Sequence, residues 1–196
     1  MNTHHASGDT TPRPDERNPW VFSTRELARR PGTRRVVQRV APAPGGDQVI
    51  GLAGVIAVPE GSDVDLDLSL ESVTEGVFVS GEAEARLEGE CSRCLEPLTD
   101  EVTAPIGELF AYPDSVTEET TDADEIPRLV DEKFDLLQTV RDAIVTDLPM
   151  APLCREDCPG LCSGCGDRWA DLPSEHGHET LDPRWAALKE RLPSTE

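Results

Sequence analysis

The residues that point most directly to chemistry are six cysteines and two histidines in the second half of the sequence. They are Cys91, Cys94, Cys154, Cys158, Cys162, Cys165, His176 and His178. Thiolates two or three residues apart on turns can converge on one tetrahedral zinc ion, with sulfur–zinc distances of about 2.3 Å. Core packing does not require cysteine in spaced pairs, because a free cysteine otherwise behaves as a small buried hydrophobe. The spacing therefore predicts metal binding.

Eight candidate ligands would fill two four-coordinate zinc sites. One site would combine the Cys162–Cys165 pair with the His176–His178 pair. The other would join the Cys91–Cys94 pair to the Cys154–Cys158 pair. A competing hypothesis is a single all-thiolate site made by the four cysteines of residues 154–165, which leaves the first pair as free thiols. The sequence alone leaves two zinc ions, one zinc ion and no metal open.

The predicted role of the metal is structural. No feature of the sequence suggests an open coordination position beside a general base. The Cys162–Cys165 pair could also be a redox dithiol, but the βαβ context expected of a thioredoxin-like site is absent. No glycine-rich phosphate loop, nucleophile elbow or Ser/His/Asp arrangement is visible. We therefore expect neither enzyme activity nor a small-molecule substrate.

The length of the chain predicts one domain. With 196 residues, the chain can bury one ordinary core, expected over residues 20–192 and followed by a short tail at 193–196. Residues 1–19 contain no apolar run, so we expect a disordered start, no export signal and no membrane segment. A chain without an export signal is expected in the reducing cytoplasm, where paired cysteines are more often metal ligands than disulfides.

The charge restricts the partners. The formal net charge is −21, so most of the surface should repel bare nucleic acid and attract basic proteins, of which ribosomal proteins are an abundant class. Six of the 18 basic residues nevertheless gather in one N-terminal segment: Arg25, Arg29, Arg30, Arg34, Arg35 and Arg39. This arginine segment could contact phosphate, or it could dock on the acidic surface of its own chain.

Period-2 alternation predicts an antiparallel sheet. The residues at 64, 66, 68 and 70 are apolar and alternate with polar ones, and the same pattern returns from Val77 to Leu87 after the turn at residues 74–76. Cys91 continues the inner phase of the second strand, and Leu98–Ile106 is a plausible returning strand. Further expected strands lie at Val36–Val40 and Val49–Val58.

Helices are expected in three places. Capping-box spacing predicts a short helix over Thr24–Arg30, and apolar residues at helical spacing predict a long helix over Phe134–Leu148. A last helix should begin at Asp182. An acidic loop at 113–127 and a Cys/His segment at 150–180 complete the prediction. The expected fold class is α+β, with a mainly antiparallel sheet that curls towards a barrel, one long helix and a zinc-stapled C-terminal segment.

Four stretches of the sequence together resemble the YceD family of large ribosomal RNA subunit accumulation proteins. They are Phe22–Gly32 (FSTRELARRPG), Glu90–Pro97 (ECSRCLEP), Leu148–Gly166 (LPMAPLCREDCPGLCSGCG) and Asp182–Leu188 (DPRWAAL). The similarity extends over roughly Trp20 to Leu192. Related chains often carry Cys-x-Cys where this one has a histidine pair, a difference that keeps zinc-ligand chemistry and favours two sites.

The resemblance implies a non-enzymatic factor in 23S rRNA accumulation and 50S ribosome biogenesis. Its implied partner is a ribosomal protein or a large-subunit rRNA precursor particle. Because some family members lack the second cysteine group, the resemblance also implies that the shared activity depends on the arginine segment and the sheet more than on metal. The alternative hypothesis is a zinc- or thiol-based redox sensor that changes a partner interaction on oxidation.

Overall fold

A computed structural model describes residues 13–115 and 126–178 of the chain. Most of the predicted disordered start, most of the acidic loop and the helix expected from Asp182 lie outside the described residues. The strands are β1 (Val21–Ser23), β2 (Arg34–Pro42), β3 (Gly51–Leu52), β4 (Ile56–Ala57), β5 (Asp63–Ser72), β6 (Gly76–Glu90), β7 (Pro97–Ala111) and β8 (Lys133–Asp135). The helical elements are α1 (Leu137–Asp147) and the 3₁₀ turns η1 (Arg25–Leu27), η2 (Gly46–Gln48) and η5 (Trp169–Asp171).

The main sheet has six antiparallel strands. Along it, β2 pairs with β5, β5 with β6, and β6 with β7, while the short β4 pairs with β6 beyond the end of β5 and carries β3 at its side. β6 and β7 form the longest hairpin, whose register runs without interruption from Gly76↔Ala111 to Glu90↔Pro97. The Cys91–Cys94 turn therefore lies at the tip of this hairpin, as the sequence predicts.

The predicted inner face is confirmed. Every second residue of β5 and β6 is buried, except the half-buried Gly81 and Gly89, and the buried side chains form one core cluster. The buried members on the two strands are Val64, Leu66, Leu68, Leu70, Val77, Val79, Ala83, Ala85 and Leu87. Cys91 is also fully buried and belongs to a separate small cluster with the other cysteines near it. The alternation of buried and exposed residues continues as far as Cys91, because β6 ends directly before the turn that carries the first two cysteines.

The described helix is shorter than the sequence suggests. α1 covers Leu137–Asp147, whereas the prediction began at Phe134. Phe134 lies in β8, which pairs with β1 as a second, two-stranded sheet. There its ring stacks between Phe22 and Phe110, with centroid distances of 5.5 and 4.3 Å. Tertiary packing of aromatic rings therefore overrides the helical periodicity at this end.

Two other predicted elements differ from the structure. The strand expected over Val49–Val58 is a tight hairpin of β3 and β4, in which Val55 N–H donates to the carbonyl of Leu52. The helix expected over Thr24–Arg30 is only the single 3₁₀ turn η1, and Ala28 after it is left-handed at φ 49°. Both regions are compact turns closed by local hydrogen bonds.

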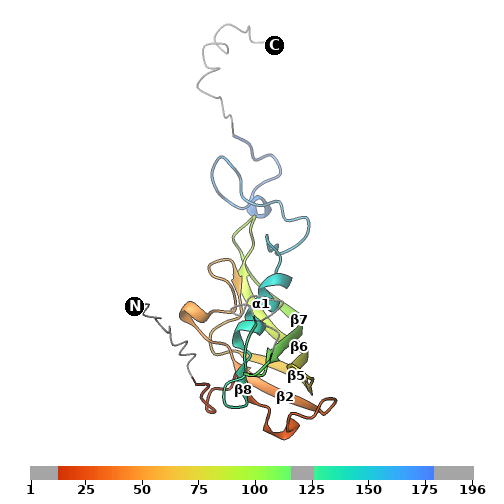
Figure 1. Ribbon diagram of the computed structural model, residues 1–196. Helices are drawn as coiled ribbons and strands as arrows, with labels where there is room; N and C mark the ends of the chain where they lie inside the picture. Colours follow the sequence, from red (N-terminus) through yellow and green to blue (C-terminus); the bar gives the residue numbers. More distant parts are fainter. Residues whose placement is uncertain (1–12, 116–125, 179–196) are drawn as a thin grey trace, which may run out of the picture.

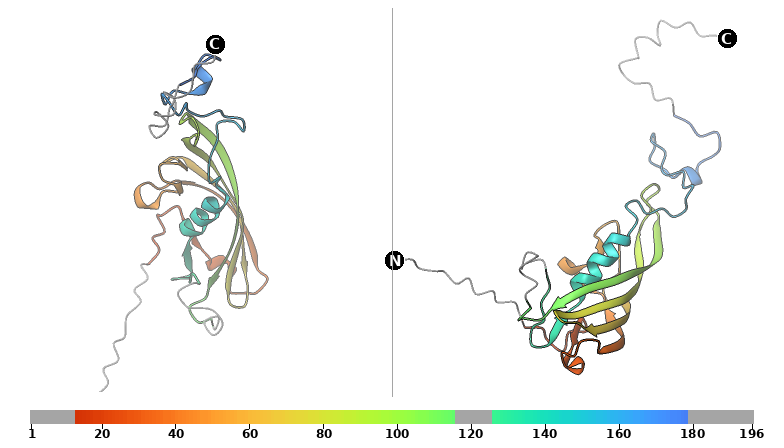
Figure 2. Two further views of the ribbon diagram at one scale, coloured as in Figure 1. Left: turned by 90° about the horizontal axis from the view of Figure 1, so that it is seen from above. Right: turned by 45° about the vertical axis from the view of Figure 1, so that its right-hand side comes forward.

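The sheet curls around α1, but its described strands do not close into a barrel (Figure 2). β2 and β7 are the outer long strands, and neither pairs with the other. The backbones of β5 and β6 come close at Gly81, where φ is +151° and a Cβ would overlap the carbonyl oxygen of Asp67. The concave face receives Val140 and Ile144 of α1, both fully buried. The open edge of β7 runs beside this helix.

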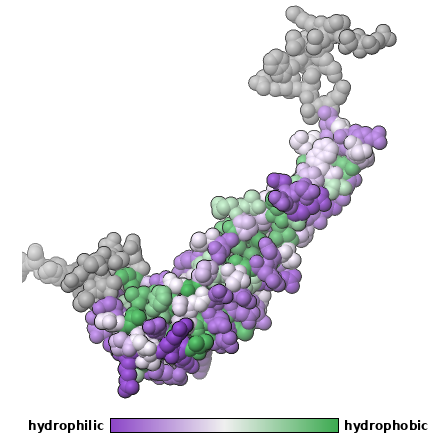
Figure 3. Space-filling view, turned by 90° about the vertical axis from the view of Figure 1, so that its right-hand side faces the viewer, coloured by the Kyte–Doolittle hydropathy of each residue, from purple (hydrophilic) through white to green (hydrophobic). Residues whose placement is uncertain are grey.

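The molecule is elongated, with the Cys/His segment projecting beyond the β6–β7 tip and the β1–β2 region at the opposite end (Figure 1). A space-filling view shows the same elongation and hydrophilic residues over much of one side (Figure 3). In the described part of the chain, no helix is long and apolar enough to cross a membrane.

Candidate metal centre

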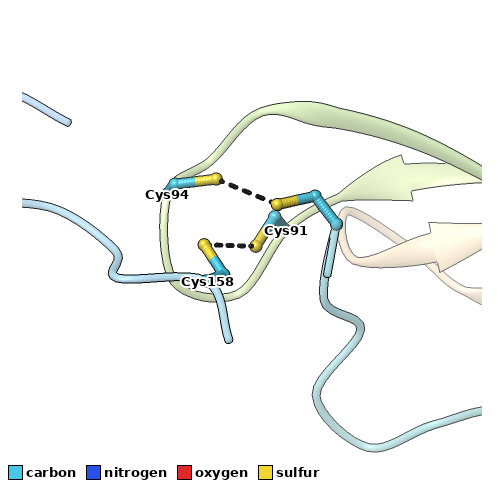
Figure 4. A group of neighbouring side chains, drawn as sticks. Cys91, Cys94 and Cys158 are labelled. Atoms are coloured by element: carbon cyan, nitrogen blue, oxygen red, sulfur yellow. Dashed lines mark hydrogen bonds between the residues drawn. The ribbon is translucent and has the colours of Figure 1, made fainter. Parts of the chain in front are cut away.

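The first cluster joins two distant segments. Cys91 and Cys94 come from the β6–β7 tip, and Cys154 and Cys158 come from the chain that follows α1; their sulfur atoms all lie within 4.8 Å of one another. Figure 4 shows Cys158 facing the two cysteines of the hairpin turn. Three of the four side chains are buried, and Cys154 is exposed.

The sulfur distances fit a tetrahedral metal. Cys91 Sγ lies 3.7 Å from Cys158 Sγ, and Cys94 Sγ lies 3.6 Å from Cys154 Sγ. Four sulfurs at 2.3 Å from one zinc ion are about 3.8 Å apart, whereas a disulfide has a sulfur–sulfur distance of about 2.05 Å. All six cysteines are free thiols. The first cluster could therefore hold a metal ion without rearrangement.

The second cluster is local in sequence and more exposed. It brings together Cys162, Cys165, His176 and His178 within 4.8 Å, of which only Cys162 is buried. Cys165 Sγ lies 3.5 Å from His176 Nε2, close to the roughly 3.6 Å expected between a sulfur and a nitrogen of one tetrahedral zinc site. The rings of the two histidines are at right angles, with centroids 4.6 Å apart. A Cβ on Gly164 would lie 2.3 Å from the His178 ring, so glycine permits this approach.

The two Cys-x-x-Cys turns share the same pattern of backbone hydrogen bonds. In the first, Leu95 N–H donates to the carbonyl of Cys91, and Cys91 N–H donates to the carbonyl of Glu96. In the second, Gly166 N–H donates to Cys162, and Cys162 N–H donates to Asp167. The residue after the second cysteine is left-handed in both, with φ 60° at Leu95 and 79° at Gly166. Leucine rarely takes this conformation, and its presence in the first turn was not foreseen from the sequence.

Backbone hydrogen bonds make one thiol in each cluster unusually acidic. Those from Cys154 first, and then from Cys94 and Arg93, lower the pKa of Cys91 to about 6. Those from Cys165 and Gly164 lower the pKa of Cys162 to about 6. Burial raises the pKa of Cys154 to about 12 and also raises that of Cys94. Each cluster therefore presents one ready thiolate, which is the form that binds a metal.

Two arginines that the sequence analysis did not single out make further contacts around the two clusters. Arg93, between the first two cysteines, donates to the carbonyl of Cys158 at 3.0 Å. Arg168 pairs with Glu96 beside the first turn and with Asp171 in η5. Opposite charge is a sequence signal for the Arg168 pairs, whereas the contact of Arg93 with a backbone carbonyl leaves no such signal. The structure thus groups the eight ligands as in the two-site hypothesis, not as one site from the four cysteines of 154–165.

The arginine segment lies at the other end of the molecule and is largely engaged by its own chain. Arg25 pairs with Glu132, Arg29 with Asp114, and Arg35 with Glu26. Arg34 donates to Ser69 Oγ. Arg39 donates to two backbone carbonyls and lies over a phenylalanine ring. Arg30 is exposed. These contacts fit the hypothesis that the segment docks on the acidic surface of its own chain.

Comparisons with known proteins place the chain in a family. The family described as "Large ribosomal RNA subunit accumulation protein YceD" matches residues 79–190, which include all eight candidate ligands. An uncharacterized protein of Mycobacterium tuberculosis (strain ATCC 25618 / H37Rv) is 47% identical over 175 residues, covering 89% of this chain and 82% of that protein. An uncharacterized protein of Mycobacterium leprae (strain TN) is 41% identical over 175 residues, covering 89% and 78%.

No solved structure matches the chain. The matched family is not a known enzyme family, and its description concerns accumulation of the large ribosomal RNA subunit. Because the family match spans more than half of the chain and includes both cysteine clusters, the protein belongs to the YceD family.

Proposed function

We propose that this protein is a non-enzymatic factor that supports accumulation of 23S rRNA and assembly of the large ribosomal subunit. The observation that carries the proposal is membership of the YceD family over residues 79–190. The proposed partner is a basic ribosomal protein or an rRNA–protein precursor particle. A net charge of −21 supports such a partner, because an acidic surface attracts basic proteins and repels bare nucleic acid.

In this proposal, the two clusters each hold one structural zinc ion. Both offer four protein ligands, and a site with four protein ligands has no open position for a reacting group. The first ion would fasten the segment after α1 to the β6–β7 tip. The second would close residues 162–178 into a loop. Zinc therefore shapes the scaffold and takes no part in a reaction.

Sedimentation of ribosomes tests the function. A strain that lacks the gene should contain fewer large subunits and less 23S rRNA than the wild type, and a plasmid copy should restore both. The purified protein should leave RNA intact, because a zinc ion with four protein ligands has no open position for a reacting water. Normal subunit ratios in the deletion strain under cold, heat and rapid growth would count against the proposal.

A second candidate function is redox sensing through the second cluster. Exposure of Cys165 and His178 favours it, because an oxidant can reach the cluster through them. The thiol with the lowered pKa, Cys162, is buried behind them. Mild peroxide should then release zinc from the second cluster and change partner binding. Unchanged partner binding after such treatment would leave only the assembly function.

A further inference from the structure

A groove of about 570 Å³ runs between α1 and the outer edge of β7. Residues of both strand phases line it, including Gly107 from the convex phase and Glu108 from the concave phase. A groove lined by both phases follows the edge of the strand and not one face of the sheet. The metal clusters are elsewhere, since no cysteine lines the groove.

The edge of β7 offers unpaired backbone groups. At its end, Ala111 N–H donates to the carbonyl of Pro127, and the carbonyl of Ala111 accepts from Leu129, so both groups of Ala111 point away from β6. Because the β6–β7 register is uninterrupted, every second residue back along the strand has the same orientation. Gly107, which lines the groove, and Leu109 therefore direct their N–H and C=O groups away from β6. Among the described strands only β6 pairs with β7.

The prolines of β7 agree with this orientation. Pro97 and Pro105 share the outward phase with Gly107, and proline without an N–H is tolerated only where the strand edge is free. The chain itself shows that this edge accepts another segment, because residues 127–129 bridge to Ala111 in parallel orientation. The remaining edge is long enough for an extended peptide of several residues.

The groove is acidic on both sides. Asp142 and Asp147 of α1 and Asp135 of β8 line it together with Glu108 of β7, and no lysine or arginine is among its described lining residues. Burial raises the pKa of Glu108, and the carboxylate of Asp142 adds to the rise. Carboxylates that crowd a half-buried groove favour a cationic occupant over an anionic one.

We propose that the β7–α1 groove binds an extended, lysine- and arginine-rich segment of a partner protein, which adds to the sheet as a further strand along β7. Main-chain hydrogen bonds to the edge hold the segment in register, and the carboxylates of the groove favour a positively charged segment. RNA is negatively charged, so the carboxylates of the groove would repel it. Residues 116–125 of the chain itself carry five acidic residues and no basic one, so like charge opposes their occupying the groove. This inference rests on the proposed function, because it names the surface that the basic partner would use.

A labelled peptide of alternating lysine and valine serves as the probe for the zinc-loaded, full-length protein. Its binding should be seen by fluorescence anisotropy, and it should weaken as salt rises. A lysine–proline peptide of equal charge cannot pair with a strand edge and should bind more weakly. A glutamate–valine peptide and a single-stranded RNA should not compete. Equal binding of the two lysine peptides would overturn strand addition, and preferential binding of RNA would overturn the partner class.

Gly107 allows a matched pair of variants. Gly107→Pro removes the outward N–H but no ladder bond to β6, and the nearby Pro105 shows that the strand tolerates proline. Gly107→Ala keeps the N–H, and its Cβ would meet nothing within 4 Å. Gly107→Pro should weaken peptide binding by about ten-fold while Gly107→Ala leaves it unchanged. Equal affinities of the two variants would overturn the proposal.

A charge variant covers the case in which Gly107→Pro fails to fold. Asp142→Asn keeps the acceptor for Gln138 and should weaken peptide binding about three-fold. Glu82→Gln removes the same charge from the exposed convex face and should have a smaller effect. Amide hydrogen exchange at Gly107 and Leu109 should slow when the peptide binds. Equal effects of the two charge variants, or unchanged exchange, would overturn the groove as the site.

The same variants separate this inference from the proposed function. If deletion of the gene leaves large subunits normal, the proposed function fails. If deletion lowers large subunits but Gly107→Pro restores them as fully as the wild type does, only the groove fails. Removal of residues 179–196 gives a further control, because stronger peptide binding after truncation would identify that segment as the occupant and overturn a partner protein.

Discussion

At the scale of single residues, the two clusters differ in the burial of their ligands. In the first cluster three of four sulfur ligands are buried, whereas in the second only Cys162 is. The first also joins segments more than 60 residues apart, so losing its metal releases a long-range contact. The second closes a loop of 17 residues, from Cys162 to His178. Loss of zinc from the first cluster should therefore destabilise the protein more than loss of zinc from the second.

A pair of ligand substitutions tests this difference. Cys91→Ser and Cys165→Ser should each lose about one zinc ion, because a four-ligand site without one thiolate binds the metal far more weakly. Cys91→Ser should lower the melting temperature more. Metal analysis by mass spectrometry and thermal unfolding measure the two effects, with Ser163→Ala as control. Full zinc content in either variant would contradict the ligand assignment.

Proton release gives the pH dependence of the first cluster. At pH 7.5 Cys91, with its pKa lowered to about 6, is already a thiolate, whereas burial keeps Cys154 and Cys94 protonated. Zinc binding must displace at least the protons of the latter two. Zinc affinity should therefore rise with pH and fall most steeply below about pH 6, where Cys91 also becomes protonated. Calorimetry in buffers of different ionisation enthalpy counts the protons, and a count of zero would refute this assignment.

At the scale of elements, the β6–β7 hairpin contributes to the core, to the first metal cluster and to the groove. Its inner face forms much of the core, its tip supplies two metal ligands, and the outer edge of β7 borders the groove. Curvature places α1 beside that edge. Gly81 lets the backbone of β5 come close to β6 in the middle of this sheet.

Glycine substitutions test the role of this close approach. Gly81→Ala should destabilise the fold by about 2 kcal/mol or more, because φ is +151° and the new Cβ would overlap the carbonyl oxygen of Asp67. Gly107→Ala, in open space on the neighbouring strand, should change stability by less than about 1 kcal/mol. Urea unfolding followed by circular dichroism compares the two. A Gly81→Ala protein as stable as the wild type would exclude the steric explanation.

At the scale of the whole molecule, acidic charge dominates and basic side chains are partly neutralised within the chain. Three of the arginines at the β1–β2 end, Arg25, Arg29 and Arg35, pair with acidic neighbours. The net charge of the whole chain is −21. Repulsion among so many carboxylates opposes the compact state. The elongated shape keeps the arginine segment and the metal clusters at opposite ends (Figure 1).

Salt dependence tests whether this repulsion dominates. Raising sodium chloride from about 20 mM to about 500 mM should increase the melting temperature, because screening weakens long-range repulsion. Exposed ion pairs contribute little each and would change stability in the opposite direction. Scanning calorimetry at constant zinc and pH measures the shift. A lower melting temperature at high salt would mean that local ion pairs outweigh the net charge.

The sequence by itself determined the hairpin and the identity of the ligands. The alternation in Val64–Leu70 and again in Val77–Leu87 defines one buried face, because a one-residue slip would expose it. The pattern therefore fixes which side chains of β5 and β6 face the core. The same phase placed Cys91 at the end of the strand. Ligand type and spacing likewise defined the eight candidate residues, because zinc chemistry accepts few other side chains.

Only the tertiary structure decided how the ligands divide and how the elements end. Sequence spacing could not say whether Cys154 would meet Cys94 or Cys165, because that depends on where the chain returns after α1. Stacking of Phe134 on two other rings shortened the predicted helix. The groove also depends on tertiary structure, since it exists only where α1 lies beside the free edge of β7. Contacts between residues far apart in sequence carry no local signal, and they determine these features.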